Sequence, residues 1–204
     1  MKKYLGLVLI ASLILSACGS KKTVATPTPI PTPRMVEIET NDRPEISLTP
    51  RSDGHELTLK MSSLSGIFSK IEYELTYVAV DNGLEIEKGV SGIVTSADIS
   101  TGKVERKLLL GTESCTSGCK YKYDTGVTGG NLTITFSTKN NQVSTFTTPF
   151  ILRTTADIKK SGKLIWTEEN YTYTPKSKLS GSSFFIVIKN YKNGDYSVTS
   201  SGAL

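Results

Sequence analysis

The chain has 204 residues, 24 of them lysine or arginine and 19 aspartate or glutamate, which gives a formal net charge of +5. This excess is mild and the basic residues are scattered, so the sequence gives no support for nucleic-acid binding. No phosphate-binding loop, EF-hand or zinc-ligand spacing occurs. Residues 36–204 are long enough for one β-sandwich, or for a sandwich with a small appendage.

The amino terminus combines a basic start with a short apolar run. Met1-Lys2-Lys3 precedes an apolar segment from Tyr4 to Leu15. This segment is well short of the roughly 20 residues that a membrane-spanning helix needs, and its length is typical of a signal peptide. The string Leu15-Ser16-Ala17-Cys18 then resembles the lipobox of bacterial lipoproteins.

The resemblance implies an address and an anchor. Residues 1–17 would be removed as a lipoprotein signal peptide, and Cys18 would carry a covalent lipid, with no other cofactor. Two or more acyl chains hold a protein stably on a bilayer. The mature chain, with a charge near +3 (5 − 2, for Lys2 and Lys3), would sit on the outer face of the cell membrane, or at the outer membrane of a two-membrane organism. The alternative is an ordinary secretory peptide with a coincidental cysteine.

Residues 18–35 predict a stalk. Prolines stand at every second position from Pro27 to Pro33, and proline favours extended backbone both at its own position and at the residue before it. At about 3.1 Å per residue, the segment from Thr26 to Pro33 alone spans some 25 Å. A ligand for a proline-reading module is the alternative to a plain spacer.

Residues 36–153 predict an immunoglobulin- or fibronectin-like antiparallel β-sandwich. Apolar residues recur with a period of two, and β-branched and aromatic residues dominate these runs. Turn residues separate seven short strands, the pattern of such sandwiches. The strands are expected at Ile46–Thr49, Glu56–Met61, Ile71–Val80, Leu84–Val94, Val104–Leu110, Asn131–Thr138 and Val143–Leu152.

Three turns fix the expected register of their hairpins. Asn82-Gly83 favours a two-residue type I′ turn, which pairs Ala79 with Ile86 and Leu75 with Val90. A three-residue loop over 139–141 pairs Ile134 with Phe146. Near the carboxyl end, Asn193-Gly194 repeats the first signal and pairs Tyr191 with Tyr196.

Residues 154–204 predict further β-strands that pack on the sandwich or extend it. They are expected at Lys163–Thr167, Tyr171–Thr174, Ser183–Lys189 and Asp195–Thr199. An independent four-stranded meander would be marginally stable. The run from Ser183 to Ile188 is apolar on both faces, which indicates a central strand covered on both sides.

Cys115 and Cys119 flank a short glycine-containing loop. Outside the cytoplasm such an isolated pair indicates a structural disulfide. Two free thiols are the alternative. The spacing is not that of a redox C-x-x-C motif, and no further ligands suggest a metal site.

The sequence yields no catalytic residues. His55, beside Asp53, is the only histidine, and no nucleophile elbow accompanies it. Four carboxylates on the predicted hairpin could act in a glycosidase, namely those of Glu72, Glu74, Glu85 and Glu87. The simpler interpretation is that they lie on the solvent-exposed faces of the hairpin strands, with Lys88 and Arg106 as ion-pair partners.

Aromatic residues give the weak candidate for ligand contact. Trp166, Tyr171 and Tyr173 could stack on sugars or contact a protein, or could instead cover the core of the small sheet. Tyr121 and Tyr123 form a second patch.

The sequence as a whole predicts a non-catalytic envelope lipoprotein for binding or structural display. Its expected partners are membrane lipid and an envelope protein or glycan. The alternatives are a carbohydrate- or peptidoglycan-binding lipoprotein and, third, a glycan hydrolase.

Overall fold

The computed structural model describes residues 32–176, 179 and 181–202. These residues belong to one compact unit that begins at Thr32. The predicted signal peptide, Cys18 and the stalk up to residue 31 lie outside the described residues. The described part of the chain is built mainly from antiparallel β-strands, as the sequence predicts.

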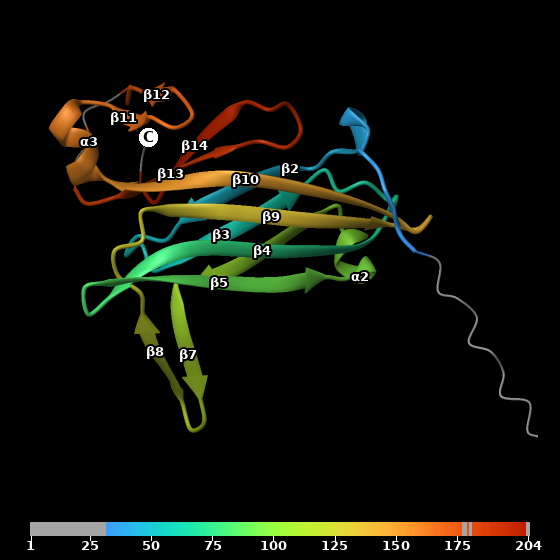
Figure 1. Ribbon diagram of the computed structural model, residues 1–204, viewed down its shortest axis with the longest axis horizontal. Coiled ribbons are helices and arrows are strands. Elements are labelled where there is room, and N and C mark those ends of the chain that lie inside the picture. The colour runs from blue at the N-terminus through green and yellow to red at the C-terminus, as the bar shows by residue number, and fades with distance from the viewer. Residues whose placement is uncertain (1–31, 177–178, 180, 203–204) are drawn as a thin grey trace, which may run out of the picture. The chain divides into compact units, whose positions relative to one another are not determined.

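The larger sheet holds six antiparallel strands in the order β14-β13-β10-β9-β4-β5 (Figure 1). A seventh, the short β1, runs parallel to the start of β10. The strands are β1 Arg34–Met35, β4 Phe68–Asp81, β5 Leu84–Val94, β9 Gly129–Thr138, β10 Gln142–Thr154, β13 Phe184–Lys189 and β14 Tyr196–Ser200.

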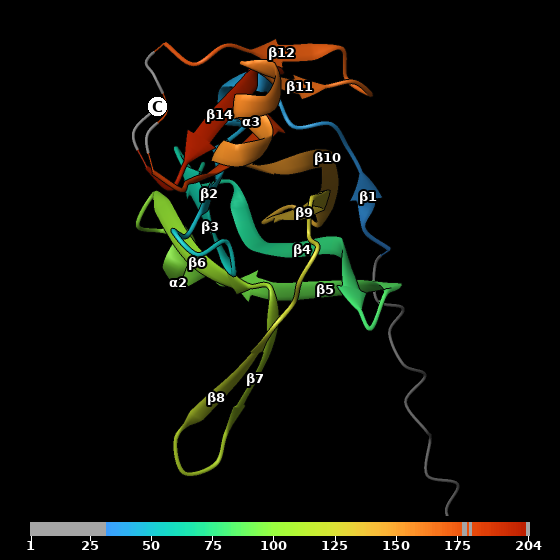
Figure 2. The same cartoon turned by 90° about the vertical axis from the view of Figure 1, so that its left-hand side faces the viewer.

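A three-stranded sheet in the order β2-β3-β6 packs against one face of the larger sheet (Figure 2). Its strands are β2 Glu45–Pro50, β3 Glu56–Ser62 and β6 Lys103–Leu109. Alternate side chains of both sheets point inward and form the main core, which includes Leu48, Leu59, Leu75 and Phe136, all fully buried. The period of two in the sequence therefore marks the buried face correctly.

Two of the three predicted turns are confirmed. Asn82 and Gly83 have φ values of +51° and +81°, and the hairpin pairs Ala79 with Ile86 and Leu75 with Val90. The loop between β9 and β10 has three residues, and Ile134 pairs with Phe146.

The third turn is wrong in register. Strand β13 ends at Lys189, which pairs with Tyr196, so Tyr191 lies in the loop. Its ring instead stacks on Phe136, with centroids 5.4 Å apart, and packs on Phe146 at 4.5 Å. Burial of this ring against the main core outweighs the preference of Asn193-Gly194 for a two-residue turn.

The chain after residue 153 adds two strands to the larger sheet and forms most of a second hydrophobic core. Helix α3 (Thr155–Ser161) leads to the two-stranded ribbon β11 (Leu164–Trp166) and β12 (Tyr171–Tyr173), which covers part of the outer face of the larger sheet. Strand β13 is central, between β10 and β14. Ile186 and Ile188 face the main core while Phe185 and Val187 face the second one, which confirms the predicted cover on both sides.

The carboxyl-terminal strands also reach the smaller sheet. The Thr199 hydroxyl donates a hydrogen bond to the carbonyl of Leu48 on β2. Lys192 forms an ion pair with Glu45 at 3.2 Å. These contacts join β14 and the β13–β14 loop to the first strand of the smaller sheet, so they close one edge of the sandwich.

A hairpin absent from the predicted strands projects from the body (Figures 1 and 2). It consists of β7 (Gly111–Cys115) and β8 (Cys119–Tyr123), and Cys115 and Cys119 are disulfide-bonded at its end with sulfurs 2.19 Å apart. The short helices α2 (Ser96–Ile99) and η1 (Thr40–Asp42) lie in connections. The predicted stalk extends too far, because Arg34 and Met35 pair with Gln142 and Val143.

Candidate functional site

The three candidate aromatic residues lie on the β11–β12 ribbon, where Trp166 pairs with Tyr171. Trp166 is only 3% exposed and meets the Tyr196 ring edge-on at 5.9 Å. Tyr171 packs on Tyr196 at 4.5 Å, and burial raises its pKa. Tyr171 and Tyr173 both pack against the second core. The rings therefore cover that core, and the indole face is not free to stack on a ligand.

A hydrogen bond holds the turn that connects the two ribbon strands. The Tyr196 hydroxyl on β14 donates to Glu169 Oε2 at 2.6 Å, and this bond raises the pKa of Tyr196.

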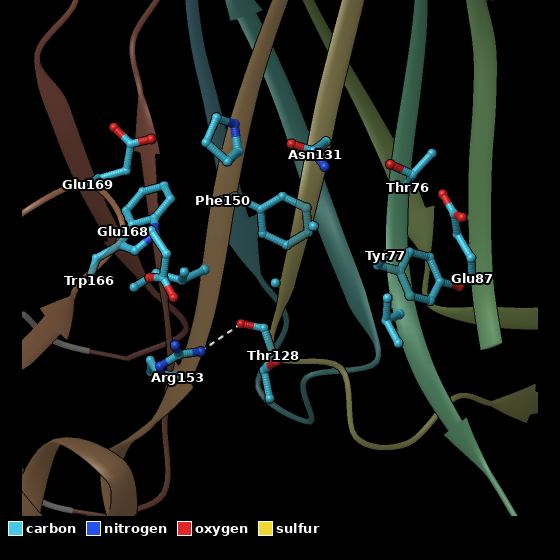
Figure 3. A pocket seen from close by; sticks show the side chains of 15 residues that line it. Thr76, Tyr77, Glu87, Thr128, Asn131, Phe150, Arg153, Trp166, Glu168 and Glu169 are labelled. Carbon is cyan, nitrogen blue, oxygen red and sulfur yellow. Dashed lines mark hydrogen bonds between the residues drawn. The ribbon is translucent and has the colours of Figure 1, made fainter. Parts of the chain in front are cut away.

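The ribbon forms one wall of a groove on the outer face of the larger sheet (Figure 3). Its volume is about 420 Å³, within the range of small-ligand sites. The floor comes from strands β4, β9 and β10, and the opposite wall from β5. The lining residues used below are Thr76, Glu87, Asn131, Arg153, Trp166 and Glu168, together with Glu169.

The groove is acidic. Glu87 and Glu168 come from opposite walls (Figure 3). Both are exposed, and neither has an ion-pair or hydrogen-bond partner among the described residues. The nearby cation is Arg153, whose Nη1 donates to the carbonyls of Thr128 at 2.7 Å and Leu152 at 3.0 Å. Two carboxylates are thus available to a ligand in the groove.

Trp166 also lines the groove. Its indole N–H makes no hydrogen bond within the described part of the chain, although the residue is nine-tenths buried or more. No described side-chain nitrogen or oxygen is both buried and without a partner.

The remaining hairpin carboxylates lie elsewhere on the same face. Glu72 and Glu74 border a separate hollow beside Thr133 and Thr135, and Glu72 pairs with Lys70 at 2.9 Å. Glu85 is exposed and outside both hollows. The partners expected for these acids are wrong, because Lys88 pairs with Asp124, and Arg106 pairs with Asp98 at 2.9 Å.

His55 lies at the base of the projecting hairpin. Its ring stacks on Tyr123 with centroids 4.4 Å apart, and Tyr123 is in turn 5.9 Å from Tyr121. Asp53 Oδ1 accepts from the backbone N–H of His55 at 3.1 Å and does not orient the imidazole. This arrangement lacks the carboxylate–imidazole bond of a catalytic triad.

One group of metal-type side chains occurs among the described residues, namely Glu113, Cys115 and Cys119. The two sulfurs are joined to each other, so they offer no thiolate ligands in this state. All three residues are exposed at the end of the hairpin.

Sequence reasoning identified Trp166 and Glu87 separately and missed Glu168, Arg153 and the groove itself. One local signal was readable: Thr154 and Asp157 form a capping box at the start of α3. That box marks where the chain leaves β10 and turns onto the outer face.

No family model, curated protein or solved structure matches the chain. Among the described residues, no helix is long and apolar enough to cross a membrane.

Proposed function

We propose that this protein is a bacterial envelope lipoprotein, anchored by lipid on Cys18, whose domain from residue 32 onward binds a partner without catalysis. The observation that carries the proposal is the lipobox Leu15-Ser16-Ala17-Cys18 after a basic, apolar leader. A compact unit that begins at Thr32, near the end of the proline-rich segment, supports it.

The anchor is tested by lipid labelling. Cells expressing the full chain are fed an alkyne fatty acid, and the protein is then examined for label and for the mass of its amino terminus. The expected result is a labelled chain that begins at Cys18 and sediments with membranes. Cys18→Ala is expected to lose the label, while Cys115→Ser with Cys119→Ser retains it. An unlabelled wild type, or one with its leader attached, would contradict the anchor.

We also infer that the sandwich is of the immunoglobulin or fibronectin type. The supporting observation is strand order: β2-β3-β6 faces a sheet in which β10-β9-β4-β5 are neighbours. Two Greek-key-connected sheets of three and four strands are typical of that class. Strands β13 and β14 would then be an addition at the β10 edge. An experimental structure with a different order of these seven strands would refute the assignment.

The groove favours carbohydrate or peptidoglycan binding as the more specific function. Convergent polar groups in a hollow of this size are typical of a small-ligand site. The stacking role expected for Trp166, Tyr171 and Tyr173 is replaced here by hydrogen bonding from the groove walls.

Binding is preferred to glycan hydrolysis because of exposure. A glycosidase acid stays protonated near neutral pH through burial in an apolar site, whereas Glu87 and Glu168 are both exposed. Incubation of the protein with cell-wall glycan fragments is therefore expected to leave their masses unchanged. Mass spectra that showed shortened products, lost in Glu168→Gln, would favour the hydrolase instead.

A further inference from the structure

We propose that this chain self-associates by strand addition, in which β8 of one copy pairs with the free edge of β5 in a second copy. The inference goes beyond the partner binding proposed above, because it assigns a defined surface to a second copy of the chain itself. It follows from two unpartnered elements, a long sheet edge and a projecting hairpin, whose alternating side chains complement each other.

Strand β5 is a long edge of the larger sheet. It pairs with β4 over eleven residues without a register shift or a proline, and no described strand pairs with its other side. Asp81 and Leu84 flank the two-residue turn and form a hydrogen-bonded pair. Because hydrogen-bonded and non-hydrogen-bonded pairs alternate from there, the backbone N–H and C=O groups of Glu85, Glu87 and Gly89 point away from β4. Such an edge is a template for another strand.

The two faces of this edge differ in chemistry. Glu85 and Glu87 lie on the outer face of the sheet, exposed and without an ion-pair partner in the described part of the chain. Leu84 and Ile86 lie on the opposite face and are 69% and 39% exposed. A strand that adds to this edge should therefore carry cations on one face and apolar groups on the other.

Strand β8 has this pattern in the run Lys120-Tyr121-Lys122-Tyr123. Successive side chains of a strand point to opposite faces, so the lysines share one face and the tyrosines the other, where their rings stack 5.9 Å apart. Every residue of β8 is exposed, and β7 is its only strand partner among the described residues. Lys122 makes only an exposed 3.7 Å pair with Asp81.

The position of the hairpin allows the contact. It projects from the body, so its strands can reach a second copy (Figures 1 and 2). Strand addition then places the two lysines opposite Glu85 and Glu87, and the two tyrosines beside Leu84 and Ile86. Pairing of β5 with β5 of the second copy would bring no cation to the acidic face. Because each copy carries both elements, reciprocal pairing closes a two-fold dimer.

The test uses the full-length chain in detergent, as an equal mixture of isotopically light and heavy copies. A carbodiimide joins amines directly to carboxylates, and we expect light–heavy cross-linked peptides between Lys120 or Lys122 and Glu85 or Glu87. Light scattering, with the detergent mass subtracted, should show the protein mass rising toward that of a dimer with concentration. Amide exchange at Glu85, Glu87 and Gly89 should slow over the same range, because these amides gain acceptors.

Charge reversal identifies the pairing. Glu87→Lys and Lys122→Glu are each expected to weaken association about tenfold or more, because each sets like charges opposite one another. The chain that carries both changes should recover the association, since the attraction is restored with its signs exchanged. Glu74→Lys is the matched control: Glu74 is exposed on the same face but lies on β4, away from the edge. It should associate like the wild type.

Four results would overturn the inference. These are a monomer at every concentration, equal weakening by Glu74→Lys, no recovery in the doubly changed chain, or a dimer that Glu87→Lys weakens and Lys122→Glu does not. The last result would place a different strand on the β5 edge. A chain that fails lipid labelling but dimerises in this way would refute the anchor alone.

Discussion

The Tyr77 hydroxyl donates a 2.8 Å hydrogen bond to Oδ2 of Asp124, a carboxylate that is only 8% exposed and lies 47 positions along the chain. Lys88 on β5 forms an ion pair with the other carboxylate oxygen. Burial, reinforced by the bond to Asp124, raises the pKa of Tyr77 well above its usual value. These three side chains fasten the segment after the projecting hairpin to strands β4 and β5.

Replacement of Asp124 by alanine is expected to destabilise the protein by about 2–3 kcal/mol, because it leaves a buried phenol and a half-buried ammonium without their partner. Urea unfolding followed by circular dichroism measures the loss. Asp81→Ala is the control, since Asp81 forms only an exposed 3.7 Å pair with Lys122, and it is expected to cost less than about 1 kcal/mol. Equal losses of unfolding free energy in the two variants would mean that the buried network stabilises the protein no more than the exposed ion pair does.

The carboxyl group of Asp53 should have a low pKa, and this should make the stability of the protein depend weakly on pH. Hydrogen bonds from Arg51 lower its pKa from 3.8 to about 2. A lowered pKa stabilises the fold above pH 3.8, and that contribution disappears as the pH falls through about 2. Because the side chain is 46% exposed, the contribution is expected to stay below about 1 kcal/mol.

NMR titration of the Asp53 carboxyl carbon checks the pKa directly. Unfolding of Asp53→Asn and wild type at pH 6 and pH 2 checks the sign: the difference should be larger at pH 6. A titration midpoint near 4 would refute the interaction with Arg51.

Gly130 is expected to tolerate no side chain. A Cβ at this position would lie 2.0 Å from the carbonyl oxygen of Thr76 and 3.0 Å from the Phe150 ring. Gly130→Ala should therefore separate β4 from β9 and cost about 1–3 kcal/mol or more. Gly66→Ala serves as the comparison, because no atom lies within 4 Å of its added Cβ. Similar melting temperatures for the two variants would contradict the close packing of these strands.

The disulfide is expected to order the hairpin and to leave the sandwich nearly unchanged. Closing so short a loop contributes about 2 kcal/mol by loop entropy, and Cys115 and Cys119 pair within a separate two-stranded sheet. In the Cys115→Ser, Cys119→Ser protein, amide exchange should accelerate over β7 and β8 only. Faster exchange across β4 and β9 would show instead that the hairpin supports the larger sheet.

Local features of the sequence determined much of the fold. The period of two identified the buried faces, and Asn82-Gly83 set the β4–β5 register, because positive φ at two adjacent positions selects one turn. The same reasoning failed at Asn193-Gly194. There the Tyr191 ring packs on Phe136 and Phe146 of distant strands, and this contact shifted the end of β13.

The disulfide pair and the β-strands were thus readable from neighbouring residues, since the patterns that mark them lie within a few positions of each other. The groove was not. Glu87 and Glu168 are far apart in the chain and line one groove only because α3 and the ribbon fold over the outer face, where Phe185 and Val187 need cover. Burial of those apolar side chains, a tertiary effect, decided which carboxylates line the same groove.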